Sequence, residues 1–151
     1  MDLSFEHLQH KDIPAIKEVL EEESGQFDPE WVKTFISEKQ NIALIAKLGD
    51  TSIGLIYGYS LTCIKARKPQ FFIYSVDIFM SYQNKGYGTR FIKYAVDWAK
   101  DNGFSETFVL THKDNPRACR AYEKAGMTHS KNDCERMYVA EYDALNNARR
   151  N

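Results

Sequence analysis

The sequence lacks the features of membrane, secreted and disulfide-linked proteins. It has no run of 18 apolar residues and therefore predicts no membrane-spanning helix and no membrane partner. The opening run MDLSFEHLQHKD has neither a basic start nor an apolar stretch, so we expect no secretory signal. The three cysteines, Cys63, Cys119 and Cys134, are widely spaced without a C-x-x-C pair, which indicates reduced thiols in a cytoplasmic protein.

Linkers and repeats are also missing. No stretch rich in proline, glycine or serine interrupts the 151 residues, and we find no repeat or low-complexity tract. A chain of this length buries about 70% of its unfolded surface, which is enough for a core without disulfides or metal ions. We therefore expect residues 1–151 to form a single domain without a metal cofactor.

The charge is nearly balanced overall but uneven along the chain. The 20 basic and 21 acidic residues give a net charge of −1, and there is no basic stripe with interleaved aromatic residues, so no nucleic-acid partner is expected. Residues 1–30 hold nine acids and two bases, whereas the other 121 residues hold 18 bases and 12 acids. The acidic start and the basic remainder could therefore meet ligands of opposite charge.

The hydrophobic pattern predicts strands alternating with helices. Strands are expected at 3–8, 41–48, 52–63, 70–79, 107–111 and 135–142. Helices are expected at 12–23, from Pro29 onward, at 88–102 and at 116–125, with Asp12, Asp28 and Asn115 as the N-caps of the first, second and fourth. This order indicates a mixed α/β (α+β) fold with a mainly antiparallel sheet flanked by helices.

Two of these elements carry further expectations. Residues 70–79 are almost wholly apolar, which predicts a central strand. The helix that begins at Pro29 is expected to bury one apolar face made of Trp31, Val32, Phe35 and Ile36.

The run Gln83-Asn-Lys-Gly-Tyr-Gly88 lies between a predicted strand and a predicted helix. Its two glycines let the backbone approach a ligand, and the free N–H groups of the first helical turn suit a pyrophosphate. A dinucleotide-binding fingerprint needs a third glycine near Phe91, and a Walker loop needs G-x-x-x-x-G-K-[ST]; the sequence has neither. On these residues alone, a strand-to-helix turn without a ligand remains an equal alternative.

A second run follows the next predicted strand. Asn115, Ala118 and Tyr122 occupy positions 0, 3 and 7 of one helix, so they share a face. The run ends in Gly126-Met127. Taken alone, Tyr122 would be a core aromatic residue.

Together the two runs resemble the GCN5-related N-acetyltransferase (GNAT) superfamily. The first is similar to its acetyl-CoA motif [QR]-x-x-G-x-[GA], and the second to N-x-x-A-x-x-x-Y-x-x-x-G-[FM]. The resemblance covers residues 71–127 and extends to the whole chain through the order of elements. Residues 41–59 and the strand through Tyr74 look most like the small-molecule branch of the gentamicin 3-N-acetyltransferase type.

The resemblance implies a cofactor site for acetyl-CoA. Backbone N–H groups after Tyr82 would cradle the pyrophosphate, with Lys85 and Arg90 adding positive charge. The strand at Val76-Asp77-Ile78 would splay from its neighbour, bind the pantetheine arm and hold the thioester carbonyl, a contribution of about 3 kcal/mol. The implied cofactor-binding residues are Val76, Asp77, Ile78, Gln83, Asn84, Lys85, Gly86, Tyr87, Gly88, Thr89, Asn115 and Tyr122.

The resemblance also implies direct attack of an amine on the thioester. Tyr122 occupies the general-acid position of the family. The base is open: relatives carry an aspartate where Ser75 falls, and here the acid is Asp77, which a bulge could bring into the site. Tyr74 and His112 are alternatives, acting through water.

The acceptor implied by the resemblance is the primary amine of a small cationic molecule, such as an aminoglycoside. Glu22, Glu23 and Asp28 fall where the family places its acceptor-binding segment, and Tyr74 is expected beside them. A charge run of this kind can equally be a solvated helix end. A protein N-terminus or lysine as acceptor, or a non-catalytic acyl-CoA sensor, are the alternative functions, and a monomer or a homodimer is expected.

Overall fold

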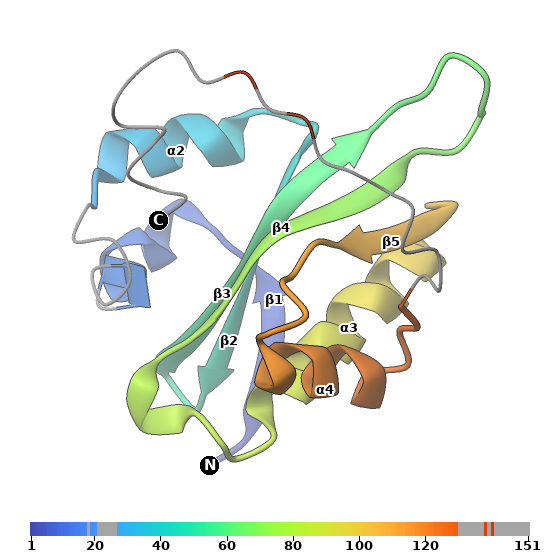
Figure 1. Cartoon of the computed structure of the whole chain (residues 1–151). Helices are drawn as coiled ribbons and strands as arrows, with labels where there is room; N and C mark the ends of the chain where they lie inside the picture. The colour runs from blue at the N-terminus through green and yellow to red at the C-terminus, as the bar shows by residue number, and fades with distance from the viewer. Residues whose placement is uncertain (18, 21–26, 130–137, 139, 141–151) are drawn as a thin grey trace.

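A five-stranded sheet forms the centre of the computed structural model, with its strands in the spatial order β1-β2-β3-β4-β5 (Figure 1). The structure describes residues 1–17, 19–20, 27–129, 138 and 140. The strands are β1 (Leu3–His7), β2 (Asn41–Leu48), β3 (Thr51–Leu61), β4 (Gln70–Ile78) and β5 (Glu106–Val109). The first three pairings are antiparallel and the β4–β5 pairing is parallel. A mixed, mainly antiparallel sheet is therefore confirmed.

Helices cover both faces of this sheet. The 3-10 helix η1 (His10–Ile16) and helix α2 (Pro29–Ser37) lie on one side in Figure 1. Helices α3 (Tyr87–Asp101) and α4 (Pro116–Lys124) lie on the other side, and the short 3-10 turn η2 (Met80–Tyr82) joins β4 to the loop before α3. These described elements match the expected ones within a few residues, and the strand expected at 135–142 lies outside the described residues.

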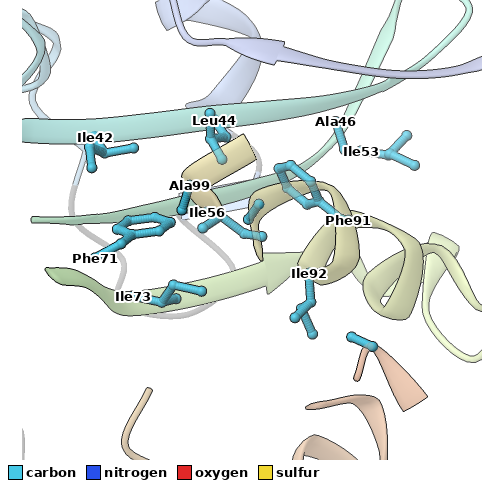
Figure 2. Packing of buried hydrophobic residues seen from close by; sticks show 12 residues of the cluster. Ile42, Leu44, Ala46, Ile53, Ile56, Phe71, Ile73, Phe91, Ile92 and Ala99 are labelled. Carbon is cyan, nitrogen blue, oxygen red and sulfur yellow. The ribbon is translucent and has the colours of Figure 1, made fainter. Parts of the chain in front are cut away.

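Two hydrophobic clusters hold the layers together. The larger cluster packs α3 against the sheet through Phe91, Ala95 and Ala99, none of which exposes any surface. Their spacing of four residues puts them on one helical face, as the sequence predicts. Figure 2 shows Phe91 and Ala99 beside the strand residues of this cluster. The smaller cluster lies under η1 and α2 and includes the buried Ile45 and Leu55 of β2 and β3. The sheet is thus covered on both faces, and β2 and β3 contribute to both clusters.

Three details differ from the sequence prediction. Gln9, not Asp12, is the N-cap of η1; Asp12 stands at the third helical position, where its carboxylate accepts a hydrogen bond from the Gln9 N–H at 2.9 Å. Trp31 is 72% exposed, so it lies outside the packed face of α2 that Val32 and Phe35 do share. β4 has a neighbour on each side, but the middle strand of the sheet is β3.

Asp28 caps α2 as expected, with its carboxylate accepting hydrogen bonds from the Glu30 and Trp31 N–H groups. Among the described residues, no helix combines the length and the apolar character needed to cross a membrane.

Candidate active site

Strands β4 and β5 separate halfway along β4. They pair from Gln70 opposite Glu106 to Ile73 opposite Val109, where β5 ends, while β4 continues to Ile78 beside β3 alone. The Phe79 N–H donates to the Ile53 carbonyl of β3, and antiparallel partners bond through alternate residues. Val76 and Ile78 therefore direct their backbone groups away from β3, into the gap that β5 leaves. The expected splay is present at this position.

A bulge in β4 changes which side chains face each side of the sheet. Ser75 pairs with Tyr57 and Ile73 pairs with Gly58, so Tyr74 is an extra residue in β4. A Cβ atom at Gly58 would lie 1.9 Å from the Phe72 carbonyl oxygen, so only glycine fits opposite the bulge. Because side chains alternate along a strand, the extra residue brings Ser75 and Asp77 onto the face that carries Tyr57.

Asp77 is one of the few charged side chains that the described core buries, with 6% of its surface exposed. Ser75 donates a hydrogen bond to its carboxylate at 2.8 Å, and Ser75 also shares a side-chain hydrogen bond with Tyr57. Burial, with smaller contributions from the charges of Asp77, Tyr74 and Tyr59, raises the pKa of Tyr57 to about 12, so this phenol stays neutral. Asp77 thus lies between the sheet core and the tyrosine.

Tyr122 reaches the same region from α4. It is half-buried against the larger hydrophobic cluster. Burial raises the pKa of its hydroxyl above the usual value, and the charges of Asp77 and Cys119 raise it further. The structure therefore brings Asp77 and Tyr122 into one electrostatic neighbourhood although 45 positions separate them in the sequence.

The two alternative bases have different surroundings. Tyr74 is 56% exposed and its ring lies 5.7 Å from that of Tyr57. His112 lies at the surface, where its Nδ1 accepts a hydrogen bond from the Asp114 N–H at 3.1 Å and lies 3.3 Å from the Asp114 carboxylate. Among these three candidates, Asp77 is the buried one, and its charge raises the pKa of Tyr122.

The loop after β4 borders a pocket of about 290 Å³. Asn84 and Gly86 have positive φ angles of 61° and 81°, and Gly86 is the N-cap of α3. A Cβ atom at Gly86 would meet no protein atom within 4 Å, so the space in front of the helix is open. The free N–H groups of the first turn of α3 face an anion site of the kind that suits a phosphate.

The residues around this pocket include six of the twelve expected cofactor-binding residues. It is lined by Ile78, Tyr82, Gln83, Asn84, Gly86, Gly88, Thr89, Arg117, Arg120, Ala121 and Lys124.

The other expected residues have different surroundings. The Lys85 Nζ atom lies 5.7 Å from the centre of the Tyr82 ring, and Tyr87 packs against the larger cluster. Asn115 caps α4, with its side-chain oxygen accepting a hydrogen bond from the Ala118 N–H at 3.2 Å. Val76 packs on the larger cluster through its side chain.

Sequence reasoning missed the three cations that α4 contributes. Arg117, Arg120 and Lys124 follow one another at three- and four-residue intervals, so they lie along one helical face. Arg117 also donates a hydrogen bond to the Gln83 side-chain oxygen at 2.7 Å, and the Gln83 amide nitrogen donates to the Ile78 carbonyl at 2.7 Å. Gln83 therefore ties the loop to both β4 and α4. The helical spacing of the three cations was the signal that could have identified them.

A larger cavity of about 790 Å³ lies under η1 and α2, on the face of the sheet that carries Tyr57. The described residues around it are mostly aromatic or aliphatic, and they include Asp28 and Tyr74 as expected. Asp28 is the one charged side chain among them. Glu22 and Glu23 lie outside the described residues. The expected carboxylate-lined site is thus, in its described part, an aromatic cavity.

Among residues 1–17, 19–20, 27–129, 138 and 140, no group of three histidine, cysteine, aspartate or glutamate side chains could hold a metal ion.

Solved structures share this architecture. An aminoglycoside acetyltransferase, meta-AAC0020, from an uncultured soil metagenomic sample in complex with sisomicin superposes with a TM-score of 0.78 at 21% identity, over 92% of this chain and 97% of that one. Ribosomal-protein-alanine N-acetyltransferase from Brucella melitensis gives 0.78 at 14% identity, over 94% and 100%. AAC(6')-Iy with a bisubstrate analogue, CoA-S-monomethyl-acetylneamine, gives 0.75 at 12%, over 95% and 100%. At these identities the likeness concerns the fold.

The family itself is shown by the sequence match. Residues 10–127 match the Acetyltransferase (GNAT) family, a span that contains β4, the glycine-bearing loop, α3 and α4. A general acyltransferase activity, with acetyl-CoA as the cosubstrate that the family uses, follows from this match. The chain therefore belongs to the GNAT family of acetyltransferases.

Proposed function

We propose that residues 1–151 form one acetyltransferase domain that moves the acetyl group of acetyl-CoA to a primary amine of a small cationic molecule. The observation that carries this proposal is the position of Asp77. The β4 bulge places this buried carboxylate beside Tyr57, which lines the large cavity, while its charge also acts on Tyr122. In this proposal Asp77 is the proton acceptor, Tyr122 is the proton donor, the large cavity takes the amine and the smaller pocket takes the cofactor.

The residues around the smaller pocket fit the phosphates of coenzyme A. The first N–H groups of α3, the open space at Gly86 and the cations Arg117, Arg120 and Lys124 together favour a polyanion. Lys85 and Arg90 add positive charge to the same end of α3. The outward backbone groups of Val76 and Ile78 would bind the pantetheine arm along the gap between β4 and β5, as a peptide strand would be bound. When bound, acetyl-CoA supplies an acetyl group activated as a thioester, which the amine takes over with release of the free thiol.

The chain's own residues handle the protons of this reaction. An alkylamine has a pKa near 10, so about one molecule in a thousand is a free base at pH 7. Asp77 accepts a proton from the ammonium group, directly or through water, and so supplies the reactive free base. Tyr122 donates its proton to the leaving sulfur, whose thiol has a pKa of about 8.5. The second proton that the nitrogen loses on forming the amide returns to the Tyr122 oxygen, and Asp77 releases its proton to solvent. Because the pKa of Tyr122 is raised, its hydroxyl stays protonated throughout the physiological range.

The large cavity would hold the acceptor. Its volume of about 790 Å³ lies within the range of small-molecule sites. Two of the proteins whose solved structures share the fold, meta-AAC0020 and AAC(6')-Iy, are aminoglycoside acetyltransferases. This class of amine is therefore a candidate acceptor. Asp28 and Tyr74 lie at the cavity, and Asp28 supplies the negative charge of its described lining.

The test is the release of free thiol from acetyl-CoA, measured across aminoglycosides, polyamines, amino acids and peptides. The proposal expects turnover with at least one small amine and a lower rate with peptides. If only peptides are acetylated, the protein is a protein acetyltransferase and the small-amine proposal is wrong. Tight binding of coenzyme A without turnover of any amine would contradict the enzymatic proposal and favour an acyl-CoA sensor.

A further inference from the structure

The lining of the large cavity carries information about the acceptor that the family membership does not contain. Six of its described residues are aromatic, and Asp28 is the one ionisable carboxylate. The six aromatic residues are Phe27, Trp31, Phe35, Tyr57, Tyr59 and Tyr74. A polycation with many hydroxyl groups needs a matching set of carboxylates and hydrogen-bond partners, because buried polar groups without partners cost free energy. The described wall offers few of these.

Four of the aromatic rings form one continuous wall on β3, β4 and α2. The Phe35 ring lies 5.6 Å from Tyr57 and 5.8 Å from Tyr59, and both contacts are edge-to-face. The Tyr74 ring lies 5.7 Å from Tyr57 and 5.9 Å from Tyr59. These spacings are those of favourable aromatic pairs, so the wall is held in place before any ligand arrives. Such a wall binds flat apolar groups and, through its ring faces, a single cation.

Two large aromatic side chains at this cavity are left facing solvent. Trp31 is 72% exposed and Tyr74 is 56% exposed, although both line the cavity. An exposed indole beside a cavity can bury its apolar surface when a ligand packs against it, at roughly 25 cal/mol for each Å² removed from water. Tyr74 stands at the bulge, next to the strand residues that lead to Asp77. The two exposed rings thus lie at the solvent-facing side of the cavity, and Tyr74 lies three residues before Asp77 on β4.

The single carboxylate is already engaged in local structure. One oxygen of Asp28 accepts hydrogen bonds from the Glu30 N–H at 3.0 Å and the Trp31 N–H at 3.4 Å, which fixes the start of α2. This carboxylate retains a charge, but it cannot by itself match the several amino groups of a polycation. One amino group next to Asp77 and one apolar body along the aromatic wall would satisfy the described lining.

We infer that the acceptor is an amine attached to an aromatic or similarly flat apolar body, with Trp31 and the tyrosine wall as its specificity-determining residues. This inference rests on the proposed function. The amino group would lie at the end of the cavity formed by Tyr57, whose hydroxyl reaches Asp77 through Ser75. The apolar body would extend along the wall toward Trp31.

The test compares three amines at saturating acetyl-CoA: 2-phenylethylamine, spermidine and sisomicin. We expect kcat/KM for 2-phenylethylamine to exceed the values for both polycations at least tenfold. Equal or faster turnover of spermidine or sisomicin would overturn the inference while leaving the proposed acetyltransferase activity intact.

Variants separate the aromatic wall from general effects on folding. Trp31→Ala should raise KM for 2-phenylethylamine about tenfold with little change in kcat, and Trp31→Phe should restore most of the loss. Ile64→Ala removes another exposed apolar side chain, on the loop between β3 and β4, and is the control that should match the wild type. Asp28→Asn keeps a residue that caps helices equally well and should raise KM less than Trp31→Ala does. A larger effect of Asp28→Asn would overturn the aromatic assignment.

Binding without turnover keeps the two proposals distinguishable. Calorimetric titration of the wild type with 2-phenylethylamine should show binding that weakens about tenfold in Trp31→Ala. If no amine is acetylated but 2-phenylethylamine binds in this way, the proposed acetyltransferase function is wrong. The inference then still holds that the cavity binds amines with an aromatic body. If 2-phenylethylamine does not bind, or binds equally to Trp31→Ala, the inference is wrong.

Discussion

The two described pockets of this molecule differ in the residues that line them. The pocket at the start of α3 is lined by loop backbone and by three cations of α4. The cavity under η1 and α2 is larger, is lined by aromatic rings and has one described carboxylate. Asp77 belongs to β4, the strand that contributes Ile78 to the first pocket and Tyr74 to the second.

This difference in lining fits the difference between the ligands that we propose for the two pockets. A cofactor with fixed phosphates can be held by backbone N–H groups and charges, which need only glycines and a helix start. An acceptor of variable shape is selected by the surfaces of side chains on several elements. The first kind of site therefore leaves a short sequence motif, and the second leaves residues scattered over the chain.

The largest expected effect is on the chemistry between the pockets. Tyr122→Phe removes the proposed proton donor and should lower kcat between 100- and 1,000-fold, because general acid catalysis contributes on that scale. The dissociation constant of coenzyme A should change less than threefold, since the ring remains packed on the larger cluster. Steady-state kinetics and calorimetry measure both quantities. An unchanged kcat would remove Tyr122 as the acid.

The bulge that joins the pockets can be broken at Gly58. In Gly58→Ala the new methyl group would overlap the Phe72 carbonyl, 1.9 Å from its Cβ position, and would force β3 and β4 apart. We expect a loss of about 3 kcal/mol in the free energy of unfolding, at the upper end of overpacking effects. Gly103→Ala is the control. Gly103 lies at a surface helix end with a positive φ of 83°, and a Cβ atom there meets no neighbour within 4 Å, so this substitution tests backbone strain without overlap of atoms. Urea denaturation would show whether Gly58→Ala is the more damaging of the two.

The cofactor pocket can be weakened through its cations without touching the acceptor cavity. Arg120→Ala should raise the dissociation constant of coenzyme A about tenfold at low salt, with a smaller difference at high salt because charge interactions are screened. Lys93→Ala removes a surface cation of α3 that pairs with Asp97 and is the matched control. Equal effects of both substitutions would contradict the placement of the cofactor beside α4.

The smallest effect concerns the neutral tyrosine of the acceptor cavity. The pKa of Tyr57 is about 12 in the folded protein against 10.0 ordinarily, so the folded state holds this proton more tightly than the unfolded state. Its stabilising contribution is complete below pH 10 and is lost as the pH rises to 12. The free energy of unfolding should therefore fall less between pH 10 and pH 12 in Tyr57→Phe than in the wild type. We expect a difference of about 1 to 2 kcal/mol, because the ring is partly exposed and solvent weakens the effect. Urea denaturation at pH 9 and at the highest pH that leaves the protein folded measures this; parallel curves for both proteins would contradict it.

The glycine-bearing turn and the helix caps could be predicted from the sequence, whereas the lining of the large cavity could not, for physical reasons. Gly86 and Asn115 could be placed because a positive φ and a helix cap demand particular residues at particular positions. Asp77 could be named only conditionally, since its face depends on the extra residue at Tyr74, and a strand pattern does not reveal a bulge. Trp31 was misplaced because its helical spacing fits a buried face, and only the neighbouring elements decide that it borders a cavity instead.

The measurement that tests the central claim most directly is the pH dependence of kcat/KM for Asp77→Asn, followed by thiol release. Without the carboxylate, the reaction depends on the free amine already in solution, so the rate should rise about tenfold per pH unit below the pKa of the amine. The ratio of wild-type to variant activity should therefore fall steeply from pH 7 to pH 9. A ratio that stays constant over this range, or a variant as active as the wild type at pH 7, would contradict Asp77 as the base between the two pockets.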